Sequence, residues 1–441
     1  MFGFFDSAGR KMRENATNWL QLADKIFHYR RDQLTEAQRG ALVQQSAALR
    51  RQLEERADAG KLKLGIESLE GVLRQVGGSF YPKSAVGENV EFFLMAAIIV
   101  LGIRTYFLQP FKIPTNSMWP TYHGMKGENF APGTPAPGPL GQALRFVAFG
   151  AMRREATAPA DGEISAPFFL NPQLRTAYMA YTVRRAYKWL IIPTLVREYT
   201  FYVDGRPATV SVPADFSDID DLLQATYFPG TDPYRFIEAA ARRSQVTRGE
   251  IRLRGDAADV APTYIVDLGR TARAGEPVLR FDLLAGDQLF VDRLSYHFVR
   301  PKIGDGFVFR TRNIPEIVRT VGDQYYIKRL VGRPGDTLEI RQPALYRNGQ
   351  PITGAAAFDK NNHRLAPYPG YRNSRPGDFS QLYLRAPGDT VTVPPHTFFA
   401  LGDNSANSED GRYWGFVPEK DVVGRPLFIY FPFTRRWGPA H

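Results

Sequence analysis

Apolar residues recur at two different periods along this chain and divide it into two parts. Before residue 88 they repeat every three or four positions, which is the spacing of one face of a helix. One such stripe lies between Trp19 and Phe27, and a second consists of Leu62, Ile66, Leu69, Leu73 and Val76. Because each apolar stripe needs a partner to become buried, residues 1–88 are predicted to form a helical hairpin.

The segment that follows is apolar almost throughout. From Phe92 to Leu108 the only polar residues are Arg104 and Thr105. Extended back to Val90, one helix here would be about 28 Å long, close to the hydrocarbon thickness of a bilayer. We therefore predict a transmembrane helix over residues 89–108. A buried core helix is the alternative, because the unbroken apolar run is only 12 residues long.

Beyond this segment the pattern changes to short runs rich in aromatic and β-branched residues. Pro110, Pro114 and Pro120 exclude a helix directly after the apolar segment. Later runs such as Glu198 to Val203, which turns through Asp204-Gly205, have the character of strands joined by tight turns. The second part of the chain is therefore predicted to be mainly β, with antiparallel sheets.

Composition narrows the classes of protein and partner. The 441 residues are 44% apolar and 23% charged, which is ordinary for a globular protein and excludes a disordered chain or one with many membrane spans. The net charge of +11 suits either nucleic acid or an anionic membrane surface. No motif interleaves basic and aromatic residues as in an RNA-stacking sheet, so we expect no nucleic-acid partner.

Metal and thiol chemistry are not expected. The sequence contains no cysteine, which excludes disulfides, thiolate metal sites and a cysteine nucleophile. Its six histidines are scattered without the paired spacing of a metal site. The sequence therefore predicts neither a metal site nor a cofactor.

Three short blocks carry candidate chemistry: Phe111 to Thr121, Tyr325 to Asp336 and Ala400 to Pro418. Taken singly, each is an unremarkable loop or strand. Together and in this order, with a fourth block from Gly286 to Tyr296 between the first two, they resemble the type I signal peptidases, membrane-bound serine proteases that remove signal peptides from exported proteins. The matching residues include Pro114, Ser117, Met118, Pro120, Thr121, Tyr326, Ile327, Lys328, Arg329, Gly332, Pro334, Gly335, Asp336, Gly402, Asp403, Asn404, Ser408, Asp410, Arg412, Trp414 and Gly415.

The resemblance implies a serine nucleophile paired with a lysine base, one of the known variants of the serine protease triad. Ser117 would attack the scissile carbonyl and Lys328 would take its proton. Thr115 would supply an oxyanion-hole hydroxyl, and Ser408 would orient the lysine. The resemblance further implies a supporting charged framework of Arg329, Asp403, Asp410 and Arg412, and a small apolar substrate pocket lined by Ile113, Met118, Tyr326 and Ile327.

Departures from the family pattern lie close to these residues. Asn116 stands where glycine is common beside the nucleophile, and Ala406 and Gly411 replace a frequent acidic residue and a frequent serine. None of the three removes a reacting group. These departures can change the local geometry of the loops and the range of substrates that is accepted. They do not change the class of reaction that the resemblance implies.

By this resemblance, residues 109–121 and 286–441 form a β catalytic domain on the extracytoplasmic side of a bacterial inner membrane. The protein would cross that membrane once, with residues 1–88 in the cytoplasm. Its expected partners are the signal peptides of preproteins and membrane lipid. The alternative is a catalytically inactive, membrane-anchored β module that acts as a secretion adaptor, which would not require Ser117 and Lys328 to be present together.

Residues 122–285, called here the intervening region, are not covered by the resemblance and are predicted to be an inserted α/β region. Its stretch from Tyr178 to Val196 mixes aromatic, basic and apolar residues. One interpretation is an interfacial element that seats on lipid through Trp189, Leu190 and Ile191. The other is a buried element of a β domain.

Overall fold

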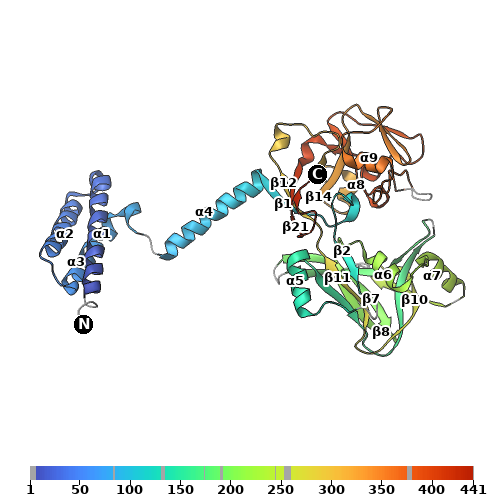
Figure 1. The fold of residues 1–441 in the computed structure, drawn as a ribbon, viewed down its shortest axis with the longest axis horizontal. Helices are drawn as coiled ribbons and strands as arrows, with labels where there is room; N and C mark the ends of the chain where they lie inside the picture. The colour runs from blue at the N-terminus through green and yellow to red at the C-terminus, as the bar shows by residue number, and fades with distance from the viewer. Residues whose placement is uncertain are drawn as a thin grey trace. The chain divides into compact units, whose positions relative to one another are not determined.

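The computed structural model describes residues 6–82, 85–130, 135–172, 174–188, 192–243, 245–252, 260–374 and 380–440. These residues divide into two compact units, Met1–Val100 and Leu101–His441, shown as a ribbon in Figure 1. Each unit has hydrophobic clusters of its own.

The first unit begins with three helices rather than the predicted hairpin. They are α1 (Asp6–Arg30), α2 (Glu36–Glu54) and α3 (Ala59–Val76). The helical character is confirmed, but α2 contributes a third apolar stripe with Leu42 and Leu49, which the charged residues around it obscure in the sequence. The turns between helices are fixed by N-caps, because the Thr35 side chain accepts from Gln38 N and Asp58 accepts from Gly60 N.

Helix α4 (Ala85–Tyr106) carries the apolar segment. Among the described residues, Val86–Tyr106 is the one helix long and apolar enough to cross a membrane, and none of it is buried within the protein. The helix starts four residues before the predicted 89–108 and ends earlier, because Leu108 already opens strand β1. Exposed side chains such as Phe92, Phe93 and Ile98 contradict the alternative of a buried core helix.

The predicted antiparallel β architecture is confirmed in the second unit. Its largest sheet has the order β1-β12-β21-β13-β14-β19-β20, with β22 on the edge of β21. The strands are β1 (Leu108–Lys112), β12 (Gln288–Asp292), β13 (Gly306–Arg310), β14 (Tyr325–Gly332), β19 (Thr397–Leu401), β20 (Phe416–Pro418), β21 (Val422–Phe431) and β22 (Gly438–Pro439). Because β1 pairs with β12 across the whole intervening region, this sheet joins segments that are far apart in the sequence.

A second, four-stranded sheet packs beside it. It consists of β15 (Thr337–Arg341), β16 (Ala344–Arg347), β17 (Gln350–Pro351) and β18 (Thr390–Thr392). Leu338, Ile340 and Phe358 of this part share one core with Phe399 of the large sheet. Short helices α8 (Pro315–Thr320), α9 (Ala356–Asn362) and α10 (Gly411–Trp414) lie between strands. The shared core fixes the loop after β19 against the large sheet.

The intervening region has sheets and a core of its own, labelled in Figure 1. One sheet has the order β2-β11-β3, and the other β6-β7-β4-β10-β9 with β5 and β8 paired to it. The strands are β2 (Lys126–Asn129), β3 (Met152–Thr157), β4 (Gly162–Asn171), β5 (Thr176–Met179), β6 (Tyr181–Lys188), β7 (Ile192–Val203), β8 (Arg206–Pro213), β9 (Val246–Arg252), β10 (Val260–Ala272) and β11 (Pro277–Leu284). The helices are α5 (Pro139–Phe149), α6 (Ile219–Tyr227) and α7 (Pro233–Arg242). Phe201, Phe216 and Phe281 are fully buried in one core with α6 and α7.

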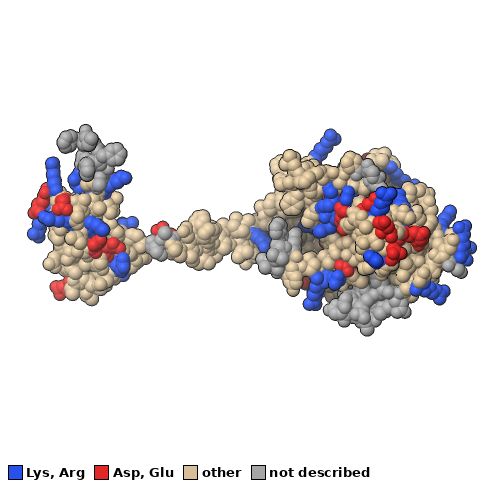
Figure 2. Space-filling view, turned by 90° about the horizontal axis from the view of Figure 1, so that it is seen from below, with Lys and Arg blue, Asp and Glu red and all other residues tan. Residues whose placement is uncertain are grey.

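The Tyr178–Val196 stretch spans β5, β6 and the start of β7. Tyr187 and Leu195 on it are exposed, whereas Met179 is buried. Trp189, Leu190 and Ile191, the residues predicted to seat on lipid, lie outside the described residues. Elsewhere on the surface, acidic side chains gather on one face of the larger unit, flanked by basic ones (Figure 2).

Candidate active site

A short loop after β1 places Ser117. The single 3-10 turn Asn116–Met118 carries it, and Ser117 is buried. Two bonds from one residue of the β19–β20 connection hold the turn: Asn404 N donates to Ser117 O at 3.1 Å, and Asn404 Nδ2 donates to Asn116 O at 3.1 Å. The backbone of the loop that carries Ser117 is therefore held by a residue from near the C-terminal end of the sequence.

Strand β14 brings Lys328 to the same point. Lys328 lies in the middle of the large sheet, paired with Phe307 of β13, and is 4% exposed. Its Nζ donates a hydrogen bond of 2.7 Å to Ser117 Oγ. The structure thus brings these two predicted residues into direct contact across 211 positions of sequence.

Burial governs the charge of Lys328. Removal from water is the largest influence and lowers the pKa of this amine from 10.5 to about 8, although Asp410 and Glu409 act in the opposite direction. A protein interior disfavours the charged form of a lysine. A group with this pKa has an appreciable neutral fraction near pH 8, so it can accept a proton from the adjacent hydroxyl.

Arg329 and Asp403 form the first of two buried ion pairs behind Ser117 and Lys328. Arg329 Nε and Nη2 donate to the two Asp403 carboxylate oxygens, each at 2.6 Å, and Arg329 Nη1 donates to Gly304 O at 2.6 Å. The Thr121 hydroxyl donates to the same carboxylate. The pair therefore ties β14 to the loop after β19 and to the end of the loop that carries Ser117.

Asp410 and Arg412 form the second buried ion pair. Arg412 Nε and Nη2 donate to the carboxylate at 2.8 and 2.9 Å. Asp410 also accepts from Gly402 N, and Arg412 donates to the carbonyls of Ser405 and Ser408. This network shapes the loop that carries Ser408, so both predicted framework pairs act on backbone position.

Two predicted hydroxyls make no hydrogen bond with Ser117 or Lys328. Ser408 is buried, yet among the described residues its Oγ has no hydrogen-bond partner, Lys328 Nζ included. The Oγ lies beside the backbone of Gly402, where a Cβ would overlap both it and Ser117 O. Thr115 precedes the 3-10 turn in an extended conformation and is exposed, with no side-chain cap. Ser408 therefore lacks the contact with Lys328 that was predicted for it, whereas the oxyanion role predicted for Thr115 concerns a bound substrate and stays a prediction.

The four predicted pocket residues divide between two apolar clusters. Ile113 and Met118 are buried in one cluster, against which Ile327 packs. Tyr326 packs instead against the neighbouring cluster, with its ring 6.2 Å from that of Phe309. Met118 is 0% exposed. In this structure Met118 is therefore a packing residue rather than an open pocket wall.

Two strand edges face the region beside Ser117. Tyr325 to Lys328 pair with β13 on one side, but β19 pairs with β14 only from Arg329 onward. Strand β1 pairs only with β12 among the described strands. The rings of Phe111 on β1 and Tyr325 on β14 lie 5.2 Å apart. Unpaired edges of this kind can hydrogen-bond an extended peptide.

One contact at the site had no signal in the sequence. Asn116 Nδ2 donates to Asp218 Oδ1 at 2.9 Å, and Asn116 Oδ1 accepts from Gly124 N at 2.9 Å. Asp218 belongs to the intervening region, directly before α6. A lone aspartate in a polar turn has no distinctive pattern, so only the tertiary structure identifies it. Among the described residues there is no group of histidine and carboxylate side chains that could hold a metal.

Comparisons with known proteins agree with the motifs. The family model for signal peptidase, peptidase S26, matches residues 279–431. A probable signal peptidase I-1 of Synechocystis sp. is 33% identical over 156 residues, which are 35% of this chain and 66% of that protein. An inactive signal peptidase IA of Staphylococcus aureus is 26% identical over 151 residues, 34% of this chain and 72% of that protein.

A crystal structure of a signal peptidase I from Enterococcus faecalis also matches. It is 28% identical, its alignment covers 29% of this chain and 97% of that one, and the TM-score is 0.21. The family model begins on β11 and ends in β21, so it takes in both the strand that carries Lys328 and the loop that carries Ser408. On this agreement between motifs and family match, residues 279–431 are identified as a signal peptidase domain, and this part of the chain is similar to the type I signal peptidases.

Proposed function

We propose that this protein is a membrane-bound serine endopeptidase that removes signal peptides from exported preproteins, with Ser117 as nucleophile and Lys328 as general base. The observation that carries the proposal is the 2.7 Å contact between Lys328 Nζ and Ser117 Oγ. A neutral Lys328 accepts the hydroxyl proton as Ser117 attacks, returns a proton to the leaving amine, and then activates the water that hydrolyses the acyl-enzyme.

The oxyanion of the tetrahedral intermediate needs donors aimed at the point where its charge develops. We assign this role to the backbone N–H of Ser117 and the hydroxyl of Thr115. A rotation of the exposed Thr115 side chain brings its hydroxyl into use when a substrate is bound. The bonds from Asn404 to the loop backbone support this assignment, because donors that stabilise an oxyanion must be held in position beforehand.

The substrate backbone enters as an added strand. The unpaired edges of β1 and of Tyr325 to Lys328 offer main-chain donors and acceptors to an extended peptide on either side. Ile113 and Ile327, which flank these edges, limit the size of the side chain beside the cut. Hydrophobic pockets exclude large groups but discriminate little among small ones, which suits an enzyme with many substrates.

Helix α4 supplies the anchor in this proposal. Its 21-residue candidate span, Val86–Tyr106, would be about 31 Å long at 1.5 Å per residue, and Ser117 follows shortly after it. The nucleophile would then lie near the outer surface of a bacterial cytoplasmic membrane, with helices α1 to α3 inside. Because the chain has no cysteine, single cysteines at Lys302 and Glu54 report sidedness without background. A membrane-impermeant maleimide should label the first in intact spheroplasts and the second only after lysis.

The alternative is a catalytically inactive module that acts as a secretion adaptor, because a relative named as inactive is 26% identical over 151 residues of this chain. Cleavage of a preprotein by the full-length protein in detergent distinguishes the two. The wild type should cut after the signal peptide, as shown by N-terminal sequencing of the product, and Ser117→Ala should not. Absence of cleavage by a folded wild type in both detergent and lipid would favour the adaptor.

A further inference from the structure

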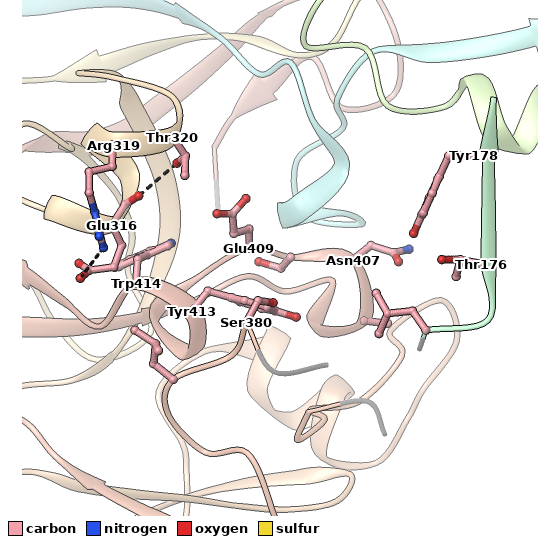
Figure 3. Close-up of a pocket in the computed structure, with 14 residues that line it drawn as sticks. Thr176, Tyr178, Glu316, Arg319, Thr320, Ser380, Asn407, Glu409, Tyr413 and Trp414 are labelled. Carbon is pink, nitrogen blue, oxygen red and sulfur yellow. Dashed lines mark hydrogen bonds and ion pairs between the residues drawn. The ribbon is translucent and has the colours of Figure 1, made fainter. Parts of the chain in front are cut away.

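A cleft of about 970 Å³ opens beside Ser408 in the larger unit. Its volume is within the range of ligand-binding sites. One wall comes from α8, α10 and the loop of residues 406–409, and the other from β5 of the intervening region. Figure 3 shows Thr176 and Tyr178 on β5 across the cleft from Asn407. Of the residues predicted for the active site, only Ser408 lines this cleft.

Three of the lining side chains have buried polar atoms that are unsatisfied. Thr176 Oγ1, Ser408 Oγ and Trp414 Nε1 have no hydrogen-bond partner within the described parts of the chain. Ser408 is 5% and Trp414 3% exposed, so neither side chain is simply turned into solvent. Burial of polar groups without partners costs free energy. The indole N–H needs an acceptor and the hydroxyls can take either role, a combination that a polypeptide backbone satisfies.

The register of β5 directs its side chains to the cleft. Thr176 and Tyr178 alternate with Ala177 and Met179 along β5 and therefore share one face, and both line the cleft, together with Leu174 of the preceding turn. Ala177 and Met179, on the opposite face, pack into the core of the intervening region. Pairing of β5 with the end of β4 fixes this orientation. The side of the cleft that β5 forms therefore has a defined orientation.

The cleft also carries an excess of negative charge. Glu316 lies 3.6 Å from Arg319 on the same helix, and both line the cleft. Glu409 lines it too, is exposed, and forms no ion pair with any described residue. A basic side chain in the occupant would pair with Glu409, whereas an acidic one would be repelled.

We propose that this cleft binds an extended stretch of the substrate polypeptide next to the bond that is cut, and that β5 of the intervening region and Glu409 select basic over acidic side chains there. This inference rests on the proposed function, because it assumes that Ser117 and Lys328 cleave the polypeptide. Ser408, which lines the cleft, connects the cleft to these two residues. The role of the intervening region would then be to contribute to substrate selection.

Steady-state cleavage by the full-length protein tests the proposal. The substrates are matched preproteins with lysine or glutamate scanned through the residues on both sides of the cut. Tyr178→Ala should raise KM about tenfold with kcat within twofold of wild type. Glu409→Gln should remove a lysine-over-glutamate preference that wild type shows at one position or more. Tyr187→Ala is the matched control, because Tyr187 is also an exposed tyrosine of the intervening region but does not line the cleft.

Equilibrium binding separates this inference from the proposed function. Fluorescence anisotropy of a labelled preprotein with Ser117→Ala protein needs no cleavage, and adding Tyr178→Ala should weaken binding about tenfold. Tyr178→Phe, which keeps the ring, should restore most of it. If the wild type cleaves and neither Tyr178→Ala nor Glu409→Gln has an effect, the proposal that the cleft binds substrate is wrong, whereas the proposed peptidase activity stands. If binding of the preprotein depends on Tyr178 but the wild type does not cleave it, the proposed peptidase activity is wrong, whereas the proposal that the cleft binds the polypeptide stands.

Discussion

Asn116, the residue before Ser117, donates a hydrogen bond of 2.9 Å to Asp218 of the intervening region, 102 positions later in the sequence. The other end of the Asn116 amide accepts from Gly124 N. Both ends of this side chain are therefore engaged. The loop that carries Ser117 is therefore held by the intervening region as well as by the large sheet.

Asp218→Ala should lower kcat for preprotein cleavage about tenfold with little change in KM. A hydrogen bond to a charged group contributes about 1.5–3 kcal/mol, and a loss of about 1.4 kcal/mol at the transition state is tenfold in rate. Asp221→Ala is the matched control, because Asp221 lies in the first turn of helix α6, three residues after Asp218, and does not contact Asn116. Equal kcat values for the two variants would show that the contact does not position Ser117.

Cleavage should depend on pH through Lys328. Its pKa is lowered to about 8 by burial, and the base works as the neutral amine. Activity should therefore rise with pH, reach half its plateau near pH 8, and fall to about one hundredth of the plateau at pH 6 if no other group limits the rate. The measurement is kcat/KM for one preprotein from about pH 6 to pH 10, because this quantity reports the pKa values of the free enzyme, with folding followed separately by circular dichroism.

Lys328→Arg gives the matching test of the base. Guanidinium keeps a positive charge and similar length but does not lose its proton in the accessible pH range. The variant should lose at least about a hundredfold in rate at every pH, since that is the smallest usual contribution of a general base. Retention of more than about a tenth of wild-type activity would show that Lys328 is only a structural cation.

Asp403→Ala should destabilise the larger unit strongly. Arg329 and Asp403 are 3% and 0% exposed, and removal of one partner of a buried pair costs about 3–5 kcal/mol because a buried charge is left uncompensated. The loss is measured as the change in free energy of unfolding in urea. The double variant Arg329→Met, Asp403→Leu should recover part of it, since no charge is then left unpaired. A double variant no more stable than Asp403→Ala would contradict this account.

Gly402→Ala should reduce cleavage at least about tenfold. A Cβ at Gly402 would overlap Ser117 O and the Ser408 side chain, so the loop must shift, and small displacements at a catalytic group are costly in rate. Gly71→Ala on α3 is the control, because a Cβ there meets no atom within 4 Å. That variant should be as active as wild type and slightly more stable. Wild-type activity of Gly402→Ala would mean that the loop adapts without cost.

The local character of each part was predictable from the sequence by itself. Repeats of three to four residues identify the helices, and short β-branched and aromatic runs identify the strands, because burial of one face imposes these periods on neighbouring residues. The motif blocks pointed to Ser117 and Lys328, since the chemistry of a site is carried by particular residue types in short segments.

Only the tertiary structure decided how these parts meet. Several features depend on residues that come together from distant positions in the sequence. They are the packing of the third N-terminal helix, the contact between Asn116 and Asp218, the unpaired hydroxyl of Ser408 and the wall of the cleft on β5. Single polar contacts leave no periodic signal in a chain, because each depends on one pair of side chains and on the packing of the elements that carry them. The sequence therefore predicts the elements and the reacting groups, whereas the packing of the elements decides what surrounds them.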